Sequence, residues 1–407
     1  MTAISENTRV RVHPTQEITT TTDTREILAN AAADNIEYDL ESMFIVDVDS
    51  HHVETDSWPE IIELVEDPVI RDYGIREMRD WPQASHLALS SLMAGLNFQD
   101  TGGRVPHQAH LGEPVPAGPL HRDVTLVERA MEAMKLNYQV VFPQPMLEIG
   151  MHPSPETATQ LMMAYNVWFT TNILGKNGRI KTMLGLPFED PDKSLDTIAR
   201  YHDHPDVLGF LVTSQRHVGV HSNQYMPIYA ELERLGMPIA FHAGPTWGDT
   251  MTSTMNRFTS VHAMSFVTCN MTHLTNWLIN GIPERFPNLK TIWVESGLAW
   301  LPFMMQRLDH EYILRSSDAP LLRKRPSDYM RDMFYTSQPM EWTDTALLEA
   351  TLTAIDAENS LLWSSDWPHW DFDLPGRIMQ IPFLSDQAKR NILGGNARKV
   401  FGHEKLS

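Results

Sequence analysis

Four side chains that could bind a divalent metal ion stand at the ends of β-forming segments. They are Asp49 and His51 in IVDVDSHHVE, His242 in PIAFHAG and Asp366 in LLWSSDWPH. Each segment breaks into polar residues or a stretch containing Gly or Pro soon afterwards. Two carboxylates and two imidazoles are hard or borderline donors, which suit Zn²⁺, Mn²⁺ or Fe²⁺. A parallel β/α barrel gathers its catalytic groups at the C-terminal ends of its strands, so we expect a metal site there.

Asp49 and His51 are two residues apart, and side chains alternate along a strand, so both should face the same side. Inside a barrel, that side is the axis. Asp47 has the same parity but lies deeper and is a weaker candidate, whereas His52 should point the other way. Taken alone, the pair could equally be a polar strand end with a solvated carboxylate.

His242 and Asp366 each have an ordinary alternative reading. A single His at a strand end is more often structural than a ligand, and an Asp before Trp-Pro is a common turn or N-cap residue. Together with Asp49 and His51, however, they place ligand groups on the first, fifth and eighth predicted strands. That coincidence favours a metal site.

The elements that must position these groups alternate along the chain. Strands are predicted at 44–49, 138–142, 181–186, 208–212, 238–242, 290–295, 333–336 and 360–364. Helices are predicted at 154–174, 192–201, 224–235, 271–285, 300–314 and 343–357. Eight βα repeats predict an α/β fold, a (β/α)8 TIM barrel over residues 41–407.

Two further regions are expected around this barrel. Residues 1–40 are predicted to form an N-terminal arm with a short helix around Arg25–Ala33. Roughly ninety residues separate the first two strands, far more than a βα connection needs, so an inserted cap is expected at about 55–120. A second long loop, 243–270, is expected after the fifth strand.

Composition limits the partners. The chain has 407 residues and a net charge of −20, which argues against nucleic acid or an anionic membrane surface. No apolar run approaches the roughly 18 residues that a membrane span needs. The single cysteine, Cys269, excludes an internal disulfide framework and fits a reducing cytoplasm. A small-molecule carboxylic or aromatic substrate is compatible with all of this.

Several motifs between residues 43 and 403 resemble the metal-dependent amidohydrolase superfamily, in its branch related to aminocarboxymuconate-semialdehyde decarboxylase. They are IVDVDSHHVE, MMAYNVWF, RIKTMLGLPFEDP, PIAFHAG, NGIPERFPNLKTIWVESGLAWLPFMMQRLDHEY, SSDWPH and NILGGNARKVFG. The resemblance implies one divalent ion per chain, expected first as Zn²⁺, and no organic cofactor. The implied ligands are Asp49, His51, His242 and Asp366. It also implies a homo-oligomer, a dimer or larger.

The sequence departs from this branch at the sixth strand. Many relatives carry a catalytic His there, but TIWVESG has Glu295. Glu295 could bind the metal, act as acid or base, or orient another group such as His262, on the long loop expected after the fifth strand. The alternatives are a structural ion pair, for example with Arg307, and an unremarkable loop His262.

Other residues are candidates for holding the substrate. Arg216 could clamp a carboxylate. Trp367 and His369, beside Asp366, are expected to line the mouth of the barrel. Trp247 could stack on an aromatic ring, although core packing is the usual role of such residues.

The resemblance implies two enzymatic readings. The first is non-oxidative decarboxylation of an aromatic or muconate-type acid, which the nearest family pattern favours. The second is metal-dependent hydrolysis of a C–N or C–O bond, with Asp366 both as ligand and as proton acceptor. A non-catalytic metal-binding protein is a third reading, which the complete ligand set disfavours.

Overall fold

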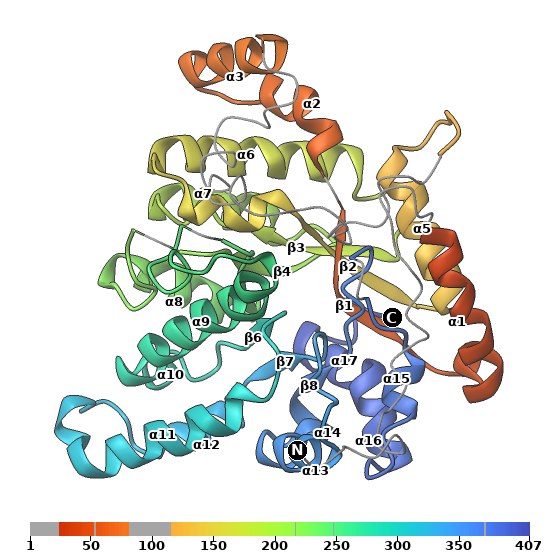
Figure 1. Cartoon of the computed structure of the whole chain (residues 1–407). Coiled ribbons are helices and arrows are strands. Elements are labelled where there is room, and N and C mark those ends of the chain that lie inside the picture. Colours follow the sequence, from red (N-terminus) through yellow and green to blue (C-terminus); the bar gives the residue numbers. More distant parts are fainter. Residues whose placement is uncertain (1–23, 53, 81–114, 216, 247, 370–371) are drawn as a thin grey trace.

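The computed structural model describes residues 24–52, 54–80, 115–215, 217–246, 248–369 and 372–407. Eight parallel strands follow one another in sheet order, and helices lie between them (Figure 1). This confirms the predicted TIM barrel. The strands are β1 (Val46–His52), β2 (Tyr138–Pro143), β3 (Ile180–Gly185), β4 (Val207–Val212), β5 (Ile239–His242), β6 (Thr291–Val294), β7 (Phe334–Thr336) and β8 (Leu361–Leu362).

The barrel closes where the region after β8 meets β1. The backbone N–H of Val48 donates to the carbonyl of Trp363 at 3.1 Å, and the N–H of Asp366 donates to the carbonyl of Asp49 at 2.8 Å. Two predicted metal ligands, Asp49 and Asp366, are therefore joined through their backbones.

The helices surround the sheet, and their ends follow local sequence signals. Asp190 caps α7 by accepting from the N–H groups of Asp192 and Lys193, and α8 ends at the left-handed Gly236, as expected. The main helices are α1 (Thr24–Tyr38), α2 (Trp58–Glu63), α3 (Pro68–Asp80), α5 (Arg122–Met134), α6 (Pro155–Asn172), α7 (Pro191–Tyr201), α8 (Met226–Leu235), α9 (Phe258–Ile279) and α11 (Trp300–Arg315). Shorter ones are α10 (Ile282–Arg285), α12 (Pro326–Met330), α13 (Thr345–Ala354), α14 (Ala357–Ser360), α15 (Gly376–Met379), α16 (Asp386–Arg390) and α17 (Asn396–Phe401).

Helix α9 begins thirteen residues earlier than the helix predicted at 271–285. The Ser- and Thr-rich stretch that suggested a loop is helical because its hydroxyls bond back to carbonyls one turn earlier. Thr268 Oγ1 donates to Met264 O at 2.8 Å, and Thr272 Oγ1 donates to Thr268 O at 2.8 Å. At the other end Gly281, with φ 66°, separates α9 from α10.

The described part of the predicted arm is helix α1, which is longer than the helix expected around Arg25–Ala33. It packs against α5, and Asn35 Nδ2 donates to Ala133 O at 2.7 Å. Of the predicted cap, the structure describes α2 and α3, which lie beside α6 at one edge of the molecule (Figure 1). Residues 1–23 and 81–114 lie outside the described residues, so the arm and the cap as domains stay predictions.

The barrel has an apolar interior of its own. Side chains from successive strands meet on its axis, among them Val48, Val140 and Ile292, and the C-terminal residues Phe401 and Leu406 pack against them from the end where the strands begin. Tyr138 Oη donates to the carbonyl of Ser407 at 2.6 Å, so this last segment covers that end. A larger cluster fills the space between sheet and helices.

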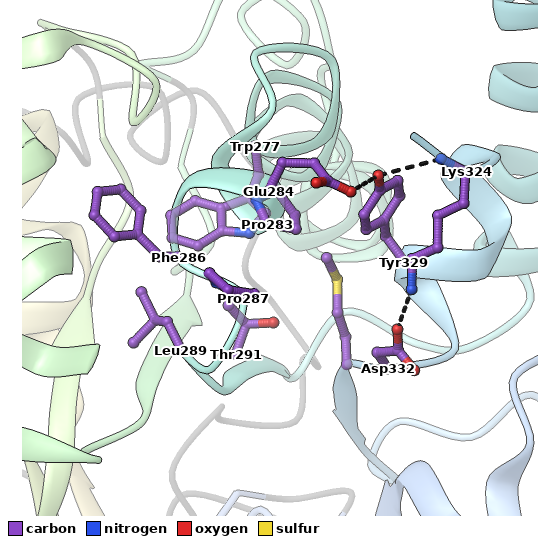
Figure 2. A pocket seen from close by; sticks show the side chains of 11 residues that line it. Trp277, Pro283, Glu284, Phe286, Pro287, Leu289, Thr291, Lys324, Tyr329 and Asp332 are labelled. Atoms are coloured by element: carbon purple, nitrogen blue, oxygen red, sulfur yellow. Dashed lines mark hydrogen bonds and ion pairs between the residues drawn. The ribbon is translucent and has the colours of Figure 1, made fainter. Parts of the chain in front are cut away.

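A cavity of about 170 Å³ lies near the N-terminal end of β6, between α10 and α12 (Figure 2). Tyr329 donates to Glu284, and Lys324 pairs with Asp332, so its polar groups satisfy one another. It is lined by Leu289 and Thr291 from the start of β6, the end of the barrel opposite to the predicted metal ligands. Among the described residues, every helix is too short or too polar to span a bilayer.

Candidate metal centre

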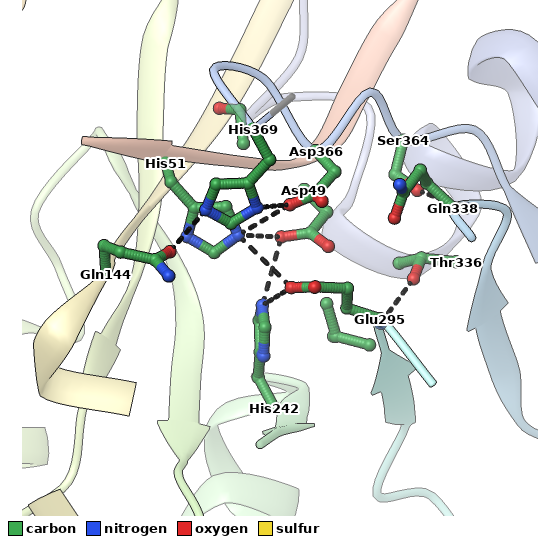
Figure 3. A network of polar contacts seen from close by, with 12 residues as sticks. Asp49, His51, Gln144, His242, Glu295, Thr336, Gln338, Ser364, Asp366 and His369 are labelled. Carbon is green, nitrogen blue, oxygen red and sulfur yellow. Dashed lines mark hydrogen bonds and ion pairs between the residues drawn. The ribbon is translucent and has the colours of Figure 1, made fainter. Parts of the chain in front are cut away.

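Six ionisable side chains converge at the C-terminal ends of four strands (Figure 3). Strand β1 brings two, the ends of β5 and β6 one each, and the segment after β8 brings two. All are at least 96% buried. The six are Asp49, His51, His242, Glu295, Asp366 and His369.

The two imidazoles expected as ligands turn their Nε2 atoms toward the centre. Nδ1 of His51 lies 3.1 Å from the carbonyl of Pro143, and Nδ1 of His242 lies 2.9 Å from the carbonyl of Ala243. Because a carbonyl oxygen only accepts, each Nδ1 carries the proton and each Nε2 presents a lone pair. Backbone partners of this kind commonly orient metal-binding histidines.

Asp49 and Glu295 stand across from these nitrogens. Oδ1 of Asp49 lies 3.4 Å from His51 Nε2 and 3.3 Å from His242 Nε2. Oε2 of Glu295 lies 3.5 Å and 3.2 Å from the same two atoms. Arg307 pairs instead with Glu311 at 2.9 Å, so the alternative of a Glu295–Arg307 ion pair is wrong. Glu295 lies among the donors.

Asp366 completes the group from the segment after β8. Its Oδ1 lies 3.1 Å from His51 Nε2. Both Asp366, with φ 62°, and Glu295, with φ 46°, adopt the left-handed backbone region. That region costs a non-glycine residue roughly 1–2 kcal/mol and persists where the surroundings fix it, often at functional sites.

The donor atoms fit a cation. Asp49 Oδ1, His51 Nε2, His242 Nε2, Glu295 Oε2 and Asp366 Oδ1 are all buried, and none has a hydrogen-bond partner of good geometry within the described ranges. Three carboxylates this close together need a positive charge between them. Five orphaned donor atoms of oxygen and imidazole nitrogen are what a divalent ion requires.

The electrostatics of the cluster agree with this. Burial alone would lower the pKa of His51, but the adjoining carboxylates of Asp366, Glu295 and Asp49 raise it well above its ordinary value. In His242, burial is likewise outweighed by Asp49 and Glu295, which raise its pKa to about 9. The site therefore attracts positive charge, and an ion that binds there would displace protons.

Two residues predicted to line the mouth lie deeper. His369 is 1% exposed, and its ring stacks on that of His51 with centroids 4.6 Å apart. Its Nε2 lies 2.6 Å from Gln144 Oε1 and its Nδ1 lies 2.6 Å from Asp366 Oδ1. Trp367 is 2% exposed and forms a β-bridge with Ser50. Neither lies at an exposed rim, because the segment after β8 turns inward to pair with β1.

The other predicted residues have different outcomes. His262 lies in the first turns of α9 rather than on a loop, and its ring contacts Phe266. Burial lowers its pKa while the charge of Glu295 opposes this effect, which indicates that the two are near each other. Arg216 and Trp247 lie outside the described residues, so their substrate-binding roles stay predictions.

The weaker candidates on β1 lie away from the donor group, as expected. Asp47 accepts from Gln139 Nε2 at 3.0 Å and from Ser365, and the register of β1 shifts between Asp47 and Ser50, where the regular alternation of side chains is interrupted. His52 points to the other side of β1, with Nδ1 3.0 Å from Asp123 and Nε2 2.8 Å from Tyr165 Oη.

Gln144 was not expected from the sequence. It follows β2 and contacts His369, as above. Its backbone N–H donates to Glu54 Oε2 at 3.0 Å, which fixes the start of the turn. Its position two residues after the strand predicted at 138–142 is the available sequence signal, but an amide side chain is not a typical metal ligand.

Comparison with known proteins adds to this geometry. Residues 109–403 match a family described as amidohydrolase. The chain is 24% identical over 250 residues to gamma-resorcylate decarboxylase of Rhizobium sp. (strain MTP-10005), covering 55% of this chain and 70% of that protein. It is 21% identical over 275 residues to 2-amino-3-carboxymuconate-6-semialdehyde decarboxylase of Dictyostelium discoideum, covering 66% and 73%.

Solved structures share the fold. A 2,6-dihydroxybenzoate decarboxylase in complex with 2,6-dihydroxybenzoate has a TM-score of 0.60 at 18% identity, covering 88% of this chain and 99% of the other. A 5-carboxyvanillate decarboxylase of Novosphingobium aromaticivorans, with bound manganese and a nitrobenzoic acid derivative, has a TM-score of 0.63 at 16% identity, covering 89% and 97%.

Proposed function

This chain belongs to the amidohydrolase family, and we propose that it is a metal-dependent, non-oxidative decarboxylase of an aromatic carboxylic acid. The observation that carries the proposal is the buried donor group at the end of the barrel, with His369 Nδ1 2.6 Å from Asp366 Oδ1 beside it. The names of its relatives support the reaction class, since gamma-resorcylate decarboxylase and the muconate-semialdehyde enzyme both remove a carboxyl group.

One divalent ion would be held by Asp49, His51, His242 and Asp366, with Glu295 as a fifth ligand. When bound, such an ion supplies a positive charge that holds an anionic oxygen of the substrate. With Glu295 included, oxygen donors outnumber nitrogen donors, which favours Mn²⁺ over the Zn²⁺ expected from four ligands. The manganese bound in a solved structure of the same fold agrees with that choice.

The Asp366–His369 pair would supply the proton. Because the oxygen of Gln144 faces His369 Nε2, that nitrogen carries a hydrogen and Nδ1 turns its lone pair toward Asp366. His369 Nδ1 and Asp366 Oδ1 lie 2.6 Å apart, a separation at which the two groups can share a proton. The pair can thus hold a proton beside the proposed substrate position.

In the reaction, the ring carbon that carries the carboxylate takes this proton. The bond between that carbon and the carboxylate then breaks, its electron pair stays in the ring, and CO₂ leaves. Asp366 and His369 regain a proton from solvent. Neither oxidation nor reduction takes place, so the step needs no oxidant or reductant.

We expect two further properties. The chain should form a homo-oligomer and be located in the cytoplasm. The resemblance supports the first, and the single cysteine supports the second. Light scattering of the purified chain and cell fractionation test them.

The full chain loaded with Mn²⁺ should be screened with hydroxylated benzoic acids and muconate-type acids, following CO₂ and ammonia in parallel. CO₂ release with the decarboxylated ring as product is expected. A hydrolytic product without CO₂ would support the hydrolase alternative, in which the Asp366–His369 pair accepts a proton from water. A metal-loaded chain that turns over no acid would refute the proposal.

A further inference from the structure

The connection after β2 passes across the C-terminal ends of other strands. It contains the short 3₁₀ helix η6 (Pro145–Met151). At its start Gln144 contacts His369, which follows β8. Further along, the N–H of Ser214, which follows β4, donates to the carbonyl of Leu147 at 3.1 Å. The segment is therefore held from both sides, over the end of the barrel where the donor group lies.

Glu148 lies in this segment, against the end of β5. A Cβ atom placed on Gly244 would lie 2.8 Å from Glu148 Cγ and 3.4 Å from Leu147 Cβ. A side chain at position 244 would force Glu148 to shift, so the stem of Glu148 packs closely against the backbone of Gly244. Gly244 comes two residues after His242, which brings Glu148 next to the strand end that carries a donor.

The carboxyl group of Glu148 has an unused hydrogen-bonding atom. The residue is 7% exposed, and its Oε2 is buried with no hydrogen-bond partner among the described residues. Burial raises the pKa of Glu148 to about 8, and burial is the sole cause, with no charged group of the described chain contributing. Burial thus favours the protonated form of Glu148, whose O–H can be offered to a ligand.

We propose that Glu148 lines the substrate site and that its carboxyl O–H donates a hydrogen bond to the carboxylate of the aromatic acid. This inference rests on the proposed function and names a residue that selects an anionic substrate. A hydrogen bond between a carboxylic acid and a carboxylate is short and strong. An ionised Glu148, in contrast, would repel the same anion in a site of low dielectric.

Protonation of Glu148 therefore makes substrate binding depend on pH. A Glu148 with a purely structural role would not have this effect. If only the protonated form binds, the dissociation constant varies inversely with the protonated fraction. With a pKa of about 8, that fraction falls about tenfold between pH 7 and pH 9.

Binding of 2,6-dihydroxybenzoate to the Mn²⁺-loaded full chain should be measured by calorimetry at pH 7 and pH 9, together with the other acids of the panel. The wild-type dissociation constant should rise about tenfold over this interval. Glu148→Gln keeps a donor that does not ionise, so its affinity at pH 7 should be kept and its pH dependence lost. Glu148→Leu removes the donor and should weaken binding at both pH values.

Glu284→Gln, in the cavity at the opposite end of the barrel, is the matched control and should behave as wild type. An unchanged melting temperature and metal content should accompany each variant. The inference is overturned if wild type and Glu148→Gln show the same pH dependence. Decarboxylation without pH-linked binding would refute this inference alone. Binding that depends on pH but is not followed by CO₂ release would refute only the proposed function. Failure to bind any of the acids would refute both.

Discussion

Ser365 donates two hydrogen bonds to the buried carboxylate of Asp47: its Oγ lies 2.5 Å from Oδ2, and its backbone N lies 2.8 Å from Oδ1. The two residues are 318 positions apart in the chain. Each lies close to a proposed ligand in the sequence, since Asp49 follows Asp47 by two positions and Asp366 follows Ser365 by one. The bond therefore sets the relative position of two donors from the first and last strands.

Ser365→Ala should lower stability and loosen the metal centre. The change leaves a buried carboxylate without its hydroxyl donor, which costs about 1–3 kcal/mol. Urea denaturation should show a lower midpoint, and metal titration should show weaker binding. Ser42→Ala, which removes an exposed local hydrogen bond to Asp39, is the control. Equal urea midpoints for wild type and Ser365→Ala would contradict the role of Ser365 in holding the first and last strands together.

Asp366→Asn should abolish most of the turnover while keeping the fold. The amide cannot share a proton with His369 as the carboxyl does, and loss of a general acid reduces rates by about 10²–10⁴-fold. Asn also tolerates the left-handed backbone at this position. The control is Asp356→Asn, an exposed Asp with φ 53°, which should remain active. Turnover of the Asp366 variant at the wild-type rate would exclude Asp366 as the acid.

Glu295→Gln should weaken metal binding without changing the shape of the site. The variant replaces one of three anionic donors with a neutral one, and we expect a loss of at least about 10–100-fold in affinity, the range seen for weaker ligand-shell changes. Chelator competition or the electron paramagnetic resonance of Mn²⁺ measures it. Glu349→Gln, on the exposed face of α13, is the control. Unchanged affinity would mean that Glu295 is not a ligand.

The stability of the chain should fall in mild acid because of His273. Burial lowers its folded pKa to about 4, whereas an unfolded His titrates at 6.5. Between these two pKa values the unfolded chain binds a proton at His273 that the folded chain does not bind. The contribution of His273 to the free energy of unfolding is therefore fully present above pH 6.5 and is lost as the pH falls toward 4. The contribution is about 3 kcal/mol at its largest.

His273→Gln removes this titration, so its denaturation midpoint should fall less than that of wild type between pH 7 and pH 4.5. The same change at His310, on the exposed side of α11, should leave the wild-type pH dependence in place. If the denaturation midpoints of wild type and His273→Gln fall equally between pH 7 and pH 4.5, His273 does not control the stability of the chain in acid.

Much of the barrel and part of the site could be predicted because strand geometry is regular. Alternation fixed the common direction of Asp49 and His51, and His242 and Asp366 needed only their positions at strand ends. The helix containing His262 begins earlier than predicted because Ser and Thr usually favour loops, whereas here their hydroxyls bond within the helix.

Other features depend on contacts that no local pattern encodes. The sequence left three roles open for Glu295, and its place among the donors follows from the turn of the chain after β6. The inward position of His369 follows from the pairing of its segment with β1. Glu148 carries no strand-end signal at all, and its close packing against Gly244 is a contact between distant parts of the chain.

Closure of the barrel through Asp47 and Ser365 also has a consequence for the order of folding. A centre that needs donors from both the first and the last strand cannot exist until almost the whole chain has been made, because partly synthesised barrels lack Asp366. Long-range closure of this kind is slow and entropically costly. An ion that binds only the completed centre would draw the late folding equilibrium toward the closed barrel, so metal supply should limit the yield of folded protein as well as its activity.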